Sequence, residues 1–188
     1  MWTLDPIDGT KGFLLGEQYA VCLALIEDSD VKLSVMGCPN LPASLSDPES
    51  TRGCLFVAVK GQGAEQVRRA SGIGGTQPPY PSNLALQLPL SDPASTAKPL
   101  KLQPAALASL ALLESREAAH SSHSLSGRIA QRLGLSAPPV RMDSQAKYCV
   151  LARGEGGILL RLPIPGSGYQ EKIWVRPIVI TIIIIIRF

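Results

Sequence analysis

Residues 18–60 limit most narrowly the folds that this chain can adopt. They contain three strand-like runs, QYAVCLALIE at 18–27, the alternating VKLSVMGC at 31–38, and CLFVAVK at 54–60, which GQGA closes. Asp28, Ser29 and Asp30 separate the first two runs and favour a tight turn. CPNLP at 38–42 predicts a break, because proline lacks the amide that a sheet ladder needs. The region therefore predicts an antiparallel meander.

The next region, 71–104, has a different composition, with seven prolines and three glycines. Such a composition predicts a long loop, with KPLKL at 98–102 as a strand near its end. The loop marks a domain boundary. The expected division is a first domain at 1–65, a Pro/Gly-rich linker at 66–105, a second domain at 106–175 and an apolar tail at 176–188.

The second half of the chain alternates between strand-like and helix-like patterns. LASLALLES at 107–115 fits either a helix or a buried strand, because its periodicity does not decide. SLSGRIAQRLG at 124–134 predicts a helix, since Leu125, Ile129 and Leu133 recur every four residues, Ser124 can cap it and Gly134 can end it. PVRMD and GILLRLP predict strands, and SQAKYCVLARG and YQEKIW predict helices. This alternation indicates an α/β fold with partly parallel strands.

Composition excludes several classes of protein. A net charge of +3 over 188 residues is too small to indicate nucleic-acid binding. Four cysteines without CxxC spacing predict buried, reduced thiols in a cytoplasmic protein, and two histidines make zinc binding improbable. Acidic and basic residues interrupt the first stretch, so no signal peptide is expected. IVITIIIII at 178–186 is shorter than the about 20 residues that cross a bilayer, so no membrane association is expected.

The densest chemistry lies in DPIDGT, residues 5–10. Pro6 fixes its own φ and restricts Asp5 to an extended conformation, and Gly9 permits a tight turn. Such a turn can aim both carboxylates and the Ile7 carbonyl at one point, with the Thr10 hydroxyl nearby. Hard oxygen ligands of this kind suit Mg²⁺. The simpler alternative is an Asp-rich turn that caps a short helix at residues 10–15.

A longer set of motifs resembles the magnesium-dependent, lithium-sensitive phosphatases of the inositol monophosphatase superfamily. LDPIDGTKGFLLGEQYAVCLALI and GCPNLP look like one branch, the 3'(2'),5'-bisphosphate nucleotidases of fungal type. HSSHS at 120–124, DSQAKYCVLA at 143–152, LRLP at 160–163 and YQEKIW at 169–174 follow in the same order. The resemblance covers roughly residues 2–174 and implies the layered α/β sugar-phosphatase fold, incomplete in this chain.

The resemblance also implies an activity and a set of roles. The family removes the 3'-phosphate from 3'-phosphoadenosine 5'-phosphate, and from 3'-phosphoadenylyl sulfate, with bound Mg²⁺ that activates a water. Asp5, Asp8 and the Ile7 carbonyl would be metal ligands, and Asp8 and Thr10 would act in catalysis. The nucleotide would contact Thr10, His120, Ser121, Ser144, Lys147 and Arg161. Ser144 and Lys147 lie one turn apart at a predicted helix start, which favours an anion, and Arg161 adds a forked donor.

Each of these residues also has a simpler interpretation. His120 and Ser121 can cap the following helix, Lys147 can be a solvated lysine, and Arg161 an exposed strand-end arginine. Tyr148 and Trp174 are more typical of a core than of a base-stacking surface.

Family members also carry a glutamate ligand before the DPIDGT strand and an aspartate at the position of Val175 here. The expected site is therefore incomplete, with an exposed sheet edge. Three interpretations follow: a bisphosphate nucleotidase by descent, a non-catalytic nucleotide-binding remnant, and a gene-model fragment. An inositol phosphate phosphatase is the nearest alternative enzyme. The oligomeric state is not predicted.

Overall fold

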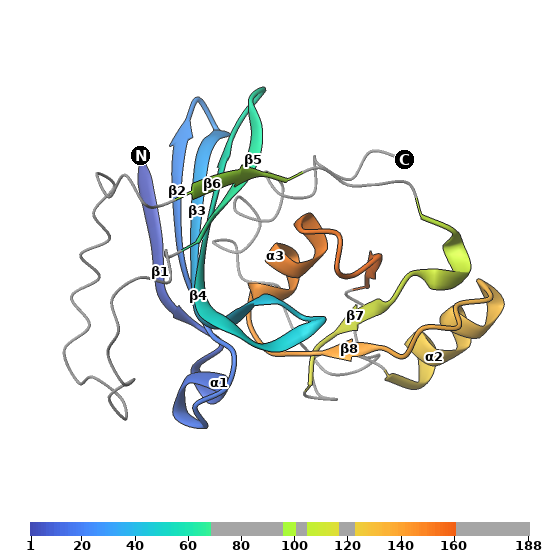
Figure 1. Cartoon of the computed structure of the whole chain (residues 1–188). Coiled ribbons are helices and arrows are strands. Elements are labelled where there is room, and N and C mark those ends of the chain that lie inside the picture. The colour runs from blue at the N-terminus through green and yellow to red at the C-terminus, as the bar shows by residue number, and fades with distance from the viewer. Residues whose placement is uncertain (69–95, 101–104, 117–122, 161–188) are drawn as a thin grey trace, which may run out of the picture.

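A six-stranded antiparallel sheet forms the first half of the molecule. The computed structural model describes residues 1–68, 96–100, 105–116 and 123–160. Strands β1 (Trp2–Asp8), β2 (Ala20–Glu27), β3 (Asp30–Ser44), β4 (Asp47–Val59), β5 (Gly63–Arg68) and β6 (Thr96–Pro99) are neighbours in chain order (Figure 1). Helix α1 (Thr10–Leu14) connects β1 to β2. The predicted meander is confirmed.

The turn between β2 and β3 has the expected composition. Asp28 and Ser29 adopt φ of 52° and 61°, and Glu27 pairs with Asp30. Two residues of positive φ match the right-handed twist of the flanking strands, which is why short polar residues occupy this loop. The predicted hairpin is confirmed.

Two predictions about this sheet are wrong. CPNLP does not end the strand, because β3 continues to Ser44 with register shifts between Cys38 and Pro42 and between Pro42 and Ser44. Irregular register lets a strand carry proline without losing a ladder bond that it needs. Strand β5, which pairs with β4 and β6, was not among the predicted strands. Strand β6 overlaps only the first two residues of the expected strand at 98–102.

The second half contains a small parallel sheet in the order β8-β7-β9, formed by β7 (Leu112–Glu114), β8 (Val140–Arg141) and β9 (Ile158–Leu159). The ambiguous 107–115 segment is a single 3-10 turn, η1 (Leu107–Ser109), followed by β7. Helices α2 (His123–Arg132) and α3 (Ala146–Ala152) complete it. The predicted alternation with parallel strands is confirmed, whereas YQEKIW lies outside the described residues.

Helix α2 ends where the sequence predicted. Gly134 has a φ of +69°, its amide bonds to the Gln131 carbonyl, and the Leu135 amide bonds to the Ala130 carbonyl. This pair of bonds is a Schellman motif. The helix begins one residue before the expected cap, Ser124.

Helix α3 fills the space between the two sheets (Figure 1), and all seven of its residues are buried. It contacts β3 of the large sheet and β7 and β9 of the small sheet. Ala20, Cys22 and Ala24 of β2 belong to the same buried cluster as α3. One buried cluster thus includes residues from both halves. The proposed division into two domains stays a prediction.

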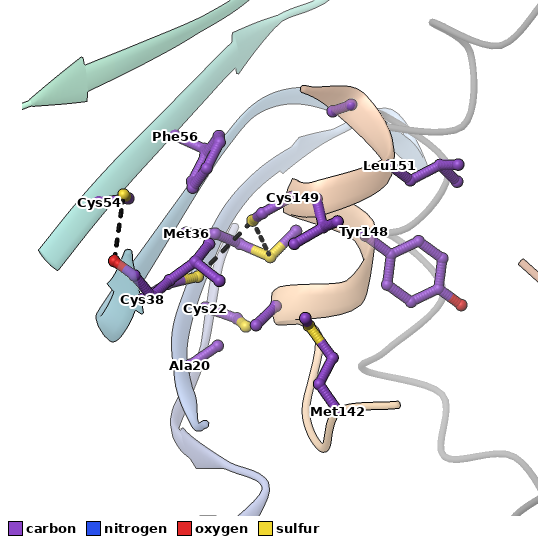
Figure 2. Packing of buried hydrophobic residues seen from close by; sticks show 14 of the residues in the cluster. Ala20, Cys22, Met36, Cys38, Cys54, Phe56, Met142, Tyr148, Cys149 and Leu151 are labelled. Atoms are coloured by element: carbon purple, nitrogen blue, oxygen red, sulfur yellow. Dashed lines mark hydrogen bonds between the residues drawn. The ribbon is translucent and has the colours of Figure 1, made fainter. Parts of the chain in front are cut away.

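The four cysteines are buried thiols, as predicted. The Cys38 thiol donates to the Cys149 sulfur over 3.7 Å, and the Cys149 thiol donates to the Met36 sulfur over 3.7 Å. Figure 2 shows these sulfur atoms pointing toward one another between α3 and the sheet. Tyr148 is 2% exposed, so its predicted place in the core is confirmed.

Strand β1 forms one edge of the sheet. It pairs with β2, and within the described residues its other side has no strand partner. Trp2 and Leu4 on this strand are each 58% exposed. None of the helices in the described ranges has the length and apolarity needed to span a bilayer.

Candidate active site

A bulge in β1 turns Asp5 and Asp8 toward the same face of the sheet. In a regular strand, residues three apart point to opposite faces. Here Asp5 pairs with Cys22 and Asp8 pairs with Ala20, so Pro6 and Ile7 together oppose one residue of β2. An extra residue of this kind resets the alternation. Both carboxylates therefore lie on the face that carries Ala20 and Cys22, which is the face that α3 covers.

Two further observations agree with this placement. Burial, and next the negative charge of Asp8, raise the pKa of the Cys22 thiol far above its usual range, with a smaller contribution from Asp5. The Asp8 carboxylate also accepts a hydrogen bond of 2.5 Å from the backbone N–H of Gln145, which lies 137 residues later in the chain. The sequence predicts a substrate phosphate near the start of this helix, and that role stays a prediction; the carboxylate of Asp8 lies there.

Residues 143–145 form a turn that packs directly on the Asp8–Gly9 turn. Ser144 has a φ of +66°, a strained conformation for serine, and its hydroxyl accepts a hydrogen bond of 3.2 Å from the Ala146 amide. Gly9 has a φ of +83°, and a Cβ added there would lie 2.6 Å from the Ser144 Cβ. The sequence missed this close approach, although the glycine in DPIDGT was its one indication.

Lys147 is 6% exposed and folds back over the turn. Its ammonium group donates to the Met142 carbonyl over 3.0 Å and to the Ser144 carbonyl over 2.8 Å. The interpretation of Lys147 as a solvated helix lysine is therefore wrong.

The chain that follows the DPIDGT segment and α1 contacts two other parts of the molecule. Thr10 is the first residue of α1 and is exposed. The chain after α1 returns through Glu17, whose carboxylate forms an ion pair with Arg116, two residues beyond β7. The Asn40 side chain donates to the Glu17 carbonyl over 2.6 Å. The motifs GEQ and PNLP thus contact each other, and Glu17 of GEQ also contacts the segment after β7.

The donor set fits a hard divalent cation. Asp5 and Asp8 supply carboxylates on one face, and Ile7, in the bulge between them, supplies a carbonyl; such oxygens suit Mg²⁺. Among the described residues, no three side chains of His, Cys, Asp or Glu converge to hold a metal ion. The role of Asp5, Ile7 and Asp8 as metal ligands stays a prediction.

His120, Ser121 and Arg161 lie outside the described residues. In the chain, His120 and Ser121 follow β7, Ser144 follows β8 and Arg161 follows β9. Ligands of open α/β sheets bind at the carboxyl ends of the strands. The roles of these residues stay predictions.

Comparison with known proteins defines the family. Residues 1–174 match the model of the inositol monophosphatase family. The chain therefore belongs to the inositol monophosphatase family.

Its similar relatives are bisphosphate nucleotidases. The chain is 43% identical over 186 residues to the 3'(2'),5'-bisphosphate nucleotidase of Emericella nidulans. This alignment covers 93% of this chain and 47% of that protein. It is 44% identical over 183 residues to the 3'(2'),5'-bisphosphate nucleotidase 1 of Arabidopsis thaliana. That alignment covers 92% of this chain and 44% of the relative. The chain thus spans about half the length of the curated relatives that it matches.

Solved structures agree on the fold. SuhB of Mycobacterium tuberculosis superposes with a TM-score of 0.57 at 18% identity, covering 98% of this chain and 59% of that chain. CysQ of Bacteroides thetaiotaomicron, a bacterial member of the inositol monophosphatase family, superposes with a TM-score of 0.51 at 22% identity. The superposition covers 86% of this chain and 52% of that chain. The α/β fold predicted from sequence is confirmed.

Proposed function

We propose that this chain carries the metal-binding and nucleotide-binding part of a Mg²⁺-dependent 3'(2'),5'-bisphosphate nucleotidase. The substrate would be 3'-phosphoadenosine 5'-phosphate or 3'-phosphoadenylyl sulfate, with release of inorganic phosphate and AMP or adenylyl sulfate. The observation that carries the proposal is the bulge of β1, which brings Asp5 and Asp8 to one face beside the 143–145 turn. The names and 43–44% identities of the relatives support the substrate class.

Each residue of the candidate site has a proposed role. Asp5, Asp8 and the Ile7 carbonyl would hold Mg²⁺. A bound Mg²⁺ supplies charge stabilisation at the scissile phosphate and a more acidic water. Thr10, on the first turn of α1, would orient that water with its hydroxyl. His120, Ser121, Ser144, Lys147 and Arg161 would bind the sugar and the other phosphate. A cytoplasmic location belongs to the same proposal and is supported by the buried thiols.

The test is phosphate release from 3'-phosphoadenosine 5'-phosphate by the purified 188-residue chain, with and without Mg²⁺. We expect Asp8→Asn to reduce release by at least about 100-fold, because even groups that only support a metal ligand change affinity or activity about 10- to 100-fold. Asp30→Asn is the matched control, since Asp30 lies in the β2–β3 hairpin and pairs with Lys32 and Lys60.

Release that survives Asp8→Asn would contradict the proposal. If folded wild-type chain releases no phosphate but binds AMP, it is a nucleotide-binding protein without catalysis. Preferential release from an inositol phosphate would identify the alternative enzyme.

A further inference from the structure

Lys147 occupies an unusual place for a lysine that is expected to bind a phosphate. It is almost completely buried, and its ammonium group meets two backbone carbonyls that precede it by five and three residues. Burial of a charge is costly unless hydrogen bonds satisfy it, so these two bonds fix the side chain over the turn. The side chain therefore joins the two ends of residues 142–144.

That turn needs such a restraint. Ser144 is held at a φ of +66°, and a non-glycine residue keeps this strained conformation only where its surroundings enforce it. Lys147 bonds the carbonyl of Ser144 itself, and the next amide in the chain, that of Gln145, bonds Asp8. The orientation of Asp8 thus depends on the turn, and the turn depends on Lys147.

We infer that Lys147 is a positioning residue for the cation site: through the strained 142–145 turn it orients the Asp8 carboxylate. This inference rests on the proposed function, because it assigns the cation to Asp5 and Asp8. It differs from a role in which Lys147 only supplies positive charge to a phosphate.

The two roles predict effects of opposite sign on cation binding without nucleotide. Removal of a nearby positive charge by itself strengthens the binding of a divalent cation. Loss of a positioning residue weakens it, because Asp8 is then less well oriented. Mn²⁺, titrated by electron paramagnetic resonance, is the probe. We expect Lys147→Met to weaken Mn²⁺ binding by about tenfold or more, the range seen for groups that support metal ligands.

A second measurement needs no metal. The Gln145 amide, bonded to Asp8, should be protected from hydrogen exchange in wild-type chain. We expect Lys147→Met to reduce that protection at least about tenfold, and Lys147→Gln, which keeps one donor group, to reduce it less. Lys60→Met is the matched control, because Lys60 is exposed and pairs with Asp30. Circular dichroism selects a temperature at which all variants are folded.

The outcomes separate the inference from the function on which it rests. Wild-type chain that binds no Mn²⁺ would refute the cation site, while the exchange measurement still tests the positioning role. Mn²⁺ binding that is unchanged or tighter in Lys147→Met, with Gln145 protection intact, would overturn the inference. If Lys147→Met does not fold, Lys147→Gln carries both measurements, and a wild-type result there would overturn it equally.

Discussion

Gly9 packs against Ser144 with no room for a side chain. Replacement by alanine should destabilise the protein for two reasons. A φ of +83° is strained for alanine, and the new Cβ would lie too close to the Ser144 Cβ. We expect a loss of about 2–4 kcal/mol in the free energy of unfolding, measured with urea, since strain and overpacking each cost about 1–3 kcal/mol.

Gly61→Ala separates these two contributions. Gly61 has a similar φ of +79°, but a Cβ there meets nothing within 4 Å. Its variant should therefore lose only the strain contribution. Equal losses in the two variants would show that the Ser144 contact carries no energy.

The geometry of the candidate site could not be predicted from sequence. The sequence predicts Asp5 and Asp8 as ligands, a role that stays a prediction, whereas the reason that they share a face is the bulge at Pro6 and Ile7. A proline in a strand permits a bulge but does not require one, because pairing with β2 decides the register. Contact of Asp8 with Gln145 depends on tertiary packing, which no local pattern encodes.

At the scale of elements, buried thiols lie between α3 and the six-stranded sheet. Burial, followed by the hydrogen bond with Cys38, raises the pKa of Cys149 well above its usual range, and burial also raises the pKa of Cys22. Unfolded thiols ionise with a pKa of about 8.5, whereas these stay protonated in the folded protein. Their contribution to stability is therefore complete below about pH 8.5 and is lost as pH rises.

The free energy of unfolding should thus fall between pH 8.5 and 9.5, with each of these thiols adding a slope of up to about 1.4 kcal/mol per pH unit. Urea unfolding at several pH values measures the slope. The double variant Cys22→Ala/Cys149→Ala should flatten it. An unchanged slope in that variant would assign the effect to other groups.

Element boundaries were predicted well where local chemistry decides them. The β2–β3 turn and the end of α2 are set by residues that tolerate positive φ, and both were found where expected. Strand β3 was predicted too short because two prolines suggested a break, yet its partner β4 holds the strand through the irregular stretch. Strand β5 was missed because its pairing with β4 and β6 is tertiary information.

At the scale of the whole molecule, an ion pair directly after α3 forms hydrogen bonds with the end of β3. The Arg153 side chain is 5% exposed, pairs with Glu155, and donates to the Pro42 carbonyl over 2.8 Å and to the Ala43 carbonyl over 3.0 Å. Glu155 in turn accepts bonds from the Ser44 hydroxyl over 2.6 Å and the Leu45 amide over 3.1 Å.

Glu155→Ala should leave a buried guanidinium without its counter-ion and lower the free energy of unfolding by about 3 kcal/mol. Urea unfolding at pH 7 provides the measurement. Asp30→Asn, which removes the exposed ion pairs with Lys32 and Lys60, should change stability far less. Similar losses in the free energy of unfolding for the two variants would mean that the buried Arg153–Glu155 pair does not stabilise the packing of the two halves.

The bond between Asp8 and Gln145 also has a consequence for synthesis of the chain. A ribosome adds about 5–20 residues per second, so Gln145 emerges roughly 7–30 s after Asp8. Among the described residues, helix α3 shares one buried cluster with Ala20, Cys22 and Met36. A nascent chain therefore lacks this packing for that time, and the hydrogen bond from Gln145 to the Asp8 carboxylate forms only after it.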